Sequence, residues 1–110
     1  MASLFFLFIA SGLLVTILGF PLLFKKIKPN PWYGFRTERT LADPRVWYAV
    51  NQYAAVRLII TGISFIVSTF VFYFVPGISV DEYAIACTVV FSIVMTIGII
   101  QSIKYLYSFG

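Results

Sequence analysis

Charged and metal-binding side chains are scarce in this sequence. Its 110 residues include no histidine, one cysteine and only four acidic residues. A single cysteine cannot form a disulfide within the chain, and tetrahedral metal sites need several His, Cys or carboxylate ligands. The lack of histidine also excludes a Ser-His-Asp arrangement. We therefore expect no metal site, no cofactor and no enzymatic activity.

Polar surface is also scarce. Hydrophobic residues make up 61% of the chain, charged residues 11%, and the mean hydropathy is +0.97. A soluble globule of this size would have to expose a large apolar surface, so the composition indicates an integral membrane protein. The net charge of +4 comes from basic residues beside hydrophobic segments. We therefore expect contact with membrane lipids and no binding of nucleic acid.

Three apolar segments, at about residues 2–24, 54–75 and 83–106, are long enough to cross the hydrocarbon core. They predict an all-α membrane protein with three transmembrane helices in a single domain, residues 1–110. The first segment has no basic n-region and no small-x-small cleavage site, so we interpret it as an uncleaved anchor. Pro21 is expected to bend or end this helix near the interface. No acid lies inside any span, which argues against the proton-coupled small multidrug exporters.

Asp43 and Pro44 form a helix start, with the aspartate as N-cap and the proline at the first helical position. From there the helical pattern continues without a breaker to residue 75, which is too long for the hydrocarbon alone. The second helix should therefore begin with an interfacial helix extension. On the third span, the small residues Ala84, Thr88, Ser92 and Thr96 recur at every fourth position and predict a helix contact.

The polar segment between the first two spans, residues 25–53, is the most informative part of the chain. Three of the five prolines and both tryptophans lie in it. Pro29 and Pro31 force the backbone into an extended path, and Gly34 permits a tight turn with positive φ. Topology alone requires only basic residues, so these extra features indicate a structured cytoplasmic loop that folds back against the helices.

Orientation follows from the basic residues. Seven of the eight lie in residues 25–57, and the eighth is Lys104. The positive-inside rule then places the N-terminus outside, with the long loop and the C-terminus in the cytoplasm.

The same loop contains a possible binding site. Arg36 and Arg39 can hold a phosphate or carboxylate in forked geometry, asparagine and threonine side chains can supply hydrogen bonds, and aromatic rings can form amphipathic walls. An ordinary loop that is basic only for topology remains the alternative. The candidate ligand- or partner-binding residues are Asn30, Tyr33, Gly34, Arg36, Thr37, Arg39, Thr40, Trp47 and Asn51.

The run KPNPWYGFRT at residues 28–37, followed by Thr40, Leu41, Trp47 and Asn51, resembles the signature of the SdpI family of bacterial membrane proteins. The resemblance implies a multi-pass protein of the bacterial cell membrane. The best-studied member protects its producer from a secreted killing peptide and recruits a transcriptional repressor to the membrane. This chain is shorter and looks like the signature domain alone. The matching signature residues are Pro29, Asn30, Tyr33, Gly34, Arg36, Thr37, Thr40, Trp47 and Asn51.

Two functions remain open at this point. The first is an immunity or signalling protein that binds a toxin peptide or a membrane-recruited regulator. The second is a protein that binds an anionic lipid, either a phospholipid or a polyprenyl phosphate, at the inner leaflet through Arg36 and Arg39. A homo-oligomer is compatible with either function.

Overall fold

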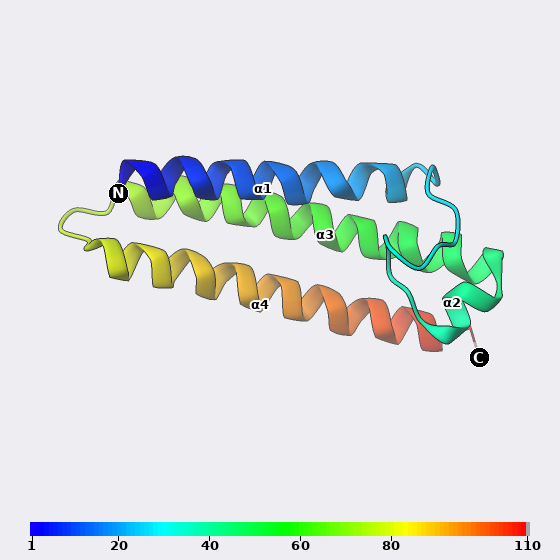
Figure 1. Cartoon of the computed structure of the whole chain (residues 1–110). Helices are drawn as coiled ribbons and strands as arrows, with labels where there is room; N and C mark the ends of the chain where they lie inside the picture. Colours follow the sequence, from blue (N-terminus) through cyan, green and yellow to red (C-terminus); the bar gives the residue numbers. More distant parts are fainter. Residues whose placement is uncertain (110) are drawn as a thin grey trace.

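The computed structural model describes residues 1–109, and that part of the chain contains helices and loops without a strand (Figure 1). The helices are α1 (Ala2–Leu23), α2 (Glu38–Ala42), α3 (Pro44–Tyr73) and α4 (Val80–Tyr107). The three long helices are each long and apolar enough to cross a membrane. The predicted all-α fold with three membrane spans is therefore confirmed.

The beginning of α3 follows the local sequence. The Asp43 side chain accepts a hydrogen bond from the backbone N–H of Arg45 at 2.9 Å, and Pro44 occupies the first turn, where its missing N–H costs nothing. The helix ends at Tyr73, two residues before the expected limit. Pro21 does not end α1 at once, because the helix continues two residues beyond it, to Leu23.

The beginning of α4 differs from the prediction by one turn. We expected the third span to start at residue 83, and the helix starts at Val80. The reason is a capping box: the Ser79 hydroxyl accepts from the N–H of Glu82 at 3.1 Å, and the Glu82 carboxylate accepts from the N–H of Ser79 at 3.2 Å. The sequence carries this signal as Ser-Val-Asp-Glu, and the hydropathy pattern alone did not show it.

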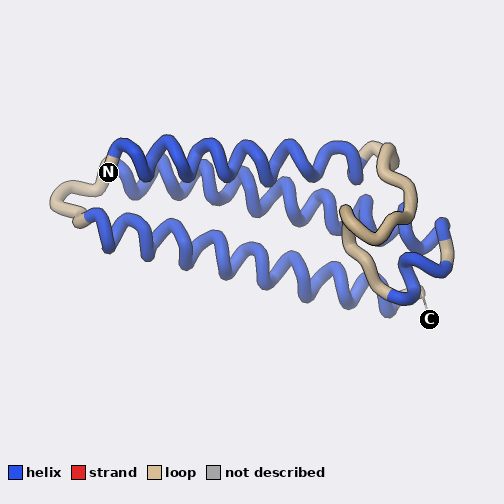
Figure 2. The backbone as a smooth tube through the Cα atoms, viewed as in Figure 1, coloured by secondary structure: helices blue, strands red, loops and turns tan. Residues whose placement is uncertain are grey.

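The central helix is α3. It packs along α1 on one side and along α4 on the other, whereas α1 and α4 do not pack along one another (Figure 2). Protein therefore covers α3 on two sides. The remaining space over α3, between α1 and α4, is where side chains, the loop or a ligand can lie.

Small residues allow α1 and α3 to approach closely. A Cβ atom at Gly62 of α3 would lie 2.9 Å from the Gly12 carbonyl oxygen of α1 and would also collide with the Thr16 hydroxyl. Close backbone approach at glycine is a common basis for helix packing in membranes, where burial of apolar side chains gives little gain. The hydropathy pattern did not distinguish these glycines.

The predicted small-residue contact on α4 is not made with any other part of residues 1–109. Thr88, Ser92 and Thr96 are exposed, and α4 turns a different face to α3. These two threonines and one serine therefore lie on the outer face of α4, away from α3. The buried residues of α4 are Tyr83, Cys87, Gly98, Ser102 and Leu106.

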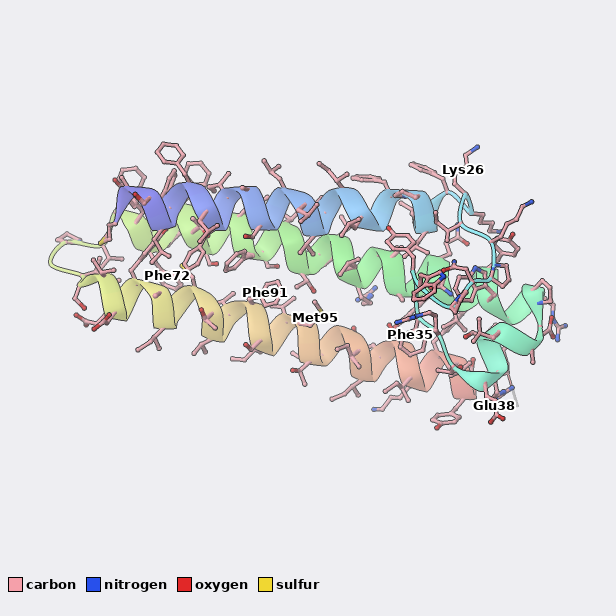
Figure 3. All side chains as sticks on the ribbon, viewed as in Figure 1. Lys26, Phe35, Glu38, Phe72, Phe91 and Met95 are labelled. Carbon is pink, nitrogen blue, oxygen red and sulfur yellow. The ribbon has the colours of Figure 1, made fainter. Side chains whose placement is uncertain are left out.

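The two ends of the molecule, which Figure 1 shows as built from different segments, also differ in charge. The N-terminus and the 74–79 loop lie at one end, near Asp81 and Glu82, and we name this the acidic end. The long 24–37 loop, α2 and the last turn of α4 lie at the other, which we name the basic end. Figure 3 shows Lys26 and Glu38 there. All basic residues except Arg57 are located in the loop, at α2 or in the terminal turns of α3 and α4 at this end.

Aromatic side chains fill the space between α1 and α4 at the acidic end. The Phe8 ring of α1 lies 5.1 Å from the Phe65 ring of α3 and 5.9 Å from the Tyr83 ring of α4. The Tyr83 hydroxyl donates to the Thr69 carbonyl at 3.0 Å, so its polar group is satisfied inside this core. Figure 3 shows Phe72 and Phe91 in the same half of the molecule.

Candidate functional site

The side chain of Asn30 stabilises the turn in the first part of the loop. Its side-chain oxygen accepts from the N–H groups of Trp32 and Tyr33 at 2.9 and 2.7 Å, and its amide donates to the carbonyls of Lys28 and Tyr33 at 2.7 and 3.1 Å. One side chain thus satisfies four backbone groups of a segment that has no helix or strand of its own. The flanking prolines cannot donate, so Asn30 supplies the bonds that this turn lacks.

Two further contacts attach the loop to the helices. The Tyr33 hydroxyl donates to the Leu18 carbonyl of α1, and Trp47 Nε1 of α3 donates to the Ile27 carbonyl at 2.9 Å. Burial raises the pKa of the Tyr33 hydroxyl, so the proton that makes the first bond is retained even more firmly than in a free tyrosine. Trp47 is completely buried. The loop is therefore packed onto the bundle.

Asn51 of α3 fixes the second half of the loop. Its side-chain oxygen accepts from the N–H of Phe35, and its amide donates to the carbonyls of Phe35 at 3.3 Å and of Trp47 at 3.0 Å. Gly34 precedes this contact with φ of 115°. A Cβ atom there would lie 2.8 Å from the Asn51 side-chain oxygen, so the position requires glycine for both conformation and space.

Thr37 and Thr40 start the short helix α2. The Thr37 hydroxyl accepts from the Thr40 N–H at 3.2 Å, and the Thr40 hydroxyl accepts from the Thr37 N–H at 2.7 Å. Thr40 is fully buried. The two threonines thus form a capping box that turns the chain toward the N-cap of α3 at Asp43.

A cavity of about 230 Å³ lies under the loop, over α3 and between α1 and α4, and it is partly open at the surface. The loop closes it toward the basic end, and the aromatic side chains described above fill the space toward the acidic end. Phe35 and Met95, both labelled in Figure 3, belong to its lining. The full lining is Leu18, Leu22, Tyr33, Gly34, Phe35, Asn51, Ala54, Arg57, Leu58, Thr61, Met95, Gly98, Ile99 and Ser102.

Comparison with known proteins identifies the loop and the helices that follow it. The model of the SdpI/YfhL protein family matches residues 26–105, which is most of the chain. The chain belongs to the SdpI/YfhL family. A curated relative, named uncharacterized protein YfhL, from Bacillus subtilis (strain 168), is 35% identical over 57 residues. That match covers 52% of this chain and 46% of the relative, so the chain spans about half of the relative's length. No solved structure matches the chain.

The structure divides the predicted site residues of this SdpI/YfhL chain into two groups. Tyr33, Gly34 and Asn51 line the cavity. The remaining residues lie outside the lining, and four of them hold the loop in place through the bonds described above. These four are Asn30, Thr37, Thr40 and Trp47.

The two loop arginines lie apart from the cavity. Arg36 is exposed, and its guanidinium donates to the Pro31 carbonyl of the same loop. Arg39 is half-buried in α2 and does not line the cavity. Trp32 is 86% exposed, so this ring points away from the bundle and suits an interfacial position.

Several lining residues were not predicted as site residues. Phe35 lies within the signature run, and Thr61 and Ser102 are polar positions inside the second and third spans. Arg57, on α3, was not among the predicted site residues either. Its position in a span without other charges could have indicated a site from the sequence, because an ionisable residue within a span commonly marks a functional site.

Proposed function

We propose that this chain is a membrane-embedded binding protein of the immunity type, and that it holds an apolar segment of a toxin peptide in the cavity under the loop. The supporting observation is that signature residues close one end of this cavity while three helices form its walls. Such a concave, mainly apolar site with a few convergent polar groups is typical of ligand binding. The cavity is partly open at the surface, and we propose that the peptide enters through this opening.

Binding without catalysis is the better proposal for this cavity. Among residues 1–109, its lining includes no Asp, Glu, His or Cys side chain that could act as general acid, base or nucleophile. Asn51, the central polar group, already has its oxygen and its amide engaged by the backbone. We therefore propose protection by capture of the peptide, with signalling through the exposed outer face of the loop as the companion function.

An anionic lipid held by Arg36 and Arg39 is the second candidate. Exposure of Arg36 beside the exposed Trp32 ring supports it, since both side chains suit the headgroup region. Arg36 uses one of its five N–H donors on the Pro31 carbonyl, and neither Arg36 nor Arg39 lines the cavity, which weighs against this candidate. We therefore rank it below peptide capture.

Filling the cavity tests the first proposal. Ala54→Phe places a large ring in the lining at a residue that makes none of the loop hydrogen bonds, and Val67→Phe adds the same ring at an exposed position of α3 outside the cavity. We expect wild type and Val67→Phe to protect a sensitive bacterium against at least one secreted membrane-active peptide from a panel, and Ala54→Phe to lose protection at equal membrane level. Equal protection by Ala54→Phe would overturn the cavity as the site. No protection by wild type against any peptide would overturn the immunity proposal.

A further inference from the structure

Arg57 lies inside the membrane-spanning part of α3. The side chain of Gln52 donates to the Leu23 carbonyl at 3.1 Å, so Gln52 marks the level at which α1 ends. Arg57 is five residues further along α3, which places it about 7–8 Å deeper at 1.5 Å per residue. The guanidinium is therefore attached to the backbone well below the end of the first span.

Its polar contacts within the chain are few. One terminal nitrogen, Nη1, donates to Gln101 Oε1 of α4 at 3.3 Å, and the guanidinium carbon lies 5.2 Å from the centre of the Tyr53 ring. The Nε atom is buried and has no hydrogen-bond partner among residues 1–109. A guanidinium has five N–H donors, so most of its donor capacity is unused by the described residues.

No carboxylate of the described residues pairs with Arg57. The one ion pair in residues 1–109 joins Arg45 and Asp43 at the start of α3. Asp81 and Glu82 lie at the acidic end of α4, and Glu38 lies in α2. A cation within a span is costly unless it is paired, so Arg57 has a strong requirement for an anion from outside the chain.

A second hollow, of about 150 Å³, lies beside Arg57 at the seam between α3 and α4. It shares only Arg57 and Gly98 with the cavity under the loop. Gly98 allows the close approach of the two helices, because a Cβ atom there would lie 3.1 Å from Arg57 Cβ. The lining of the second hollow is Arg57, Ile60, Val94, Ile97, Gly98 and Gln101.

The order of these residues along the two helices gives the hollow a polar end and an apolar end. α3 runs from the basic end inward, so Ile60 lies deeper than Arg57. α4 runs in the opposite direction, so Val94 and Ile97 lie deeper than Gln101. The polar pair therefore faces the basic-end interface, and the apolar part extends toward the middle of the bilayer. A lipid of that leaflet has the same arrangement, with its phosphate outward and its chains inward.

We infer that Arg57 and Gln101 form a binding site for the phosphate of an anionic lipid, with the upper part of an acyl chain in the hollow of Ile60, Val94 and Ile97. The guanidinium donates to phosphate oxygens, and the Gln101 amide adds a neutral donor. Lys104, three residues after Gln101, supplies a further positive charge nearer the interface. This site differs from the Arg36 and Arg39 loop, and it stands or falls independently of peptide capture in the other cavity.

The test uses the full chain in nanodiscs that contain equal amounts of phosphatidylglycerol and phosphatidylcholine. Native mass spectrometry after gentle release measures which lipid stays bound. We expect wild type to retain phosphatidylglycerol in preference to phosphatidylcholine. In Arg57→Met this preference should fall about tenfold, which is the size expected for one charge-assisted contact. Methionine keeps apolar packing at the seam, so the variant should still fold. Arg45→Met, an equal charge change at an exposed site, should leave retention unchanged.

Two further measurements are needed. One distinguishes binding of a lipid from binding of free phosphate, and the other tests whether the apolar hollow contributes in addition to the charge of Arg57. Excess inorganic phosphate should not displace the lipid, and displacement would overturn the lipid assignment in favour of a simple anion site. Val94→Phe should reduce retention by filling the hollow, whereas Val71→Phe at an exposed position of α3 should not. Equal retention of both lipids by wild type, or full retention by Arg57→Met or Val94→Phe, would overturn the proposal.

Discussion

A single side chain, that of Asn51, connects the loop to the bundle. Only 1% of this residue is exposed, and its amide group bonds three backbone groups, two of which belong to Phe35. A buried amide in a membrane helix is costly unless its hydrogen bonds are satisfied, and here the loop backbone satisfies them. The loop backbone, in turn, is satisfied by Asn51. Each partner stabilises the other.

Removing this amide should therefore destabilise the protein. We expect Asn51→Ala to lower the free energy of unfolding by about 2–4 kcal/mol, because the partly buried Phe35 N–H and C=O lose their partners. The apparent melting temperature in detergent micelles measures the effect. Gln52→Ala, which removes one hydrogen bond from a half-buried side chain, serves as the graded control. A loss no larger than that of Gln52→Ala would show that Asn51 is not the anchor of the loop.

The observed side-chain contacts also change the interpretation of the signature residues. Asn30, Thr37, Thr40 and Trp47 were predicted to bind a ligand or partner, and their side chains are engaged by the loop and the helix starts. Their chemical types were recognised in the sequence. The use of those types depends on which backbone groups come within 3 Å, and residue spacing does not give that information for an irregular loop.

At the scale of elements, the packing of α1 on α3 depends on backbone approach at glycine. Gly12 and Gly62 face one another across the contact, and a side chain at either position would collide with the opposite helix. By contrast, the stripe that contains Ser92 on α4 faces outward. Small residues at helical spacing occur on both surfaces, so the pattern alone does not tell which surface is the contact.

This difference gives a direct comparison. Gly62→Leu should destabilise the α1–α3 contact by about 3 kcal/mol or more, because the opposing backbone cannot move aside as a flexible side chain can. Ser92→Leu should change the stability of the single chain by less than about 0.5 kcal/mol, as is usual for an exposed position. Thermal unfolding of both variants in the same detergent measures the two effects. Comparable losses would show that the Ser92 face is also a helix contact.

The whole molecule is polarised along its length. The loop, α2 and the C-terminal turn carry the basic residues at one end, and the N-terminus lies at the other end with Asp81 and Glu82 (Figure 1). Three spans require that the two termini lie on opposite sides of the membrane. The positive-inside rule predicts that the basic end faces the cytoplasm.

Reporter fusions test this orientation on the intact chain. A reporter after Gly110 should be active only in its cytoplasmic form, and one inserted at Ile78 only in its exported form. The reverse pattern would place the loop, the cavity opening and the Arg57 site on the outer side of the membrane. It would also remove a cytoplasmic regulator from the proposed function.

The class, the number of spans and most helix boundaries could be predicted from the residues alone. Length and hydropathy are sufficient for these because each span must cross the same hydrocarbon thickness and satisfy its own backbone. The Asp43-Pro44 start and the turn at Gly34 were also predictable, since each depends on a few neighbouring residues. The motif of residues 28–37 indicated the family, which the comparison with residues 26–105 established.

The way in which the helix faces meet became visible only in the folded molecule. The spans are apolar on nearly all sides, and lipid is as apolar as leucine, so hydropathy does not show which face turns inward. The rotation of each helix depends on the fit of particular residues, such as Gly62 against Gly12 and Gly98 against Arg57. That fit turns the small-residue stripe outward, places Asn51 under the loop, and leaves Arg57 at a hollow without a counter-ion.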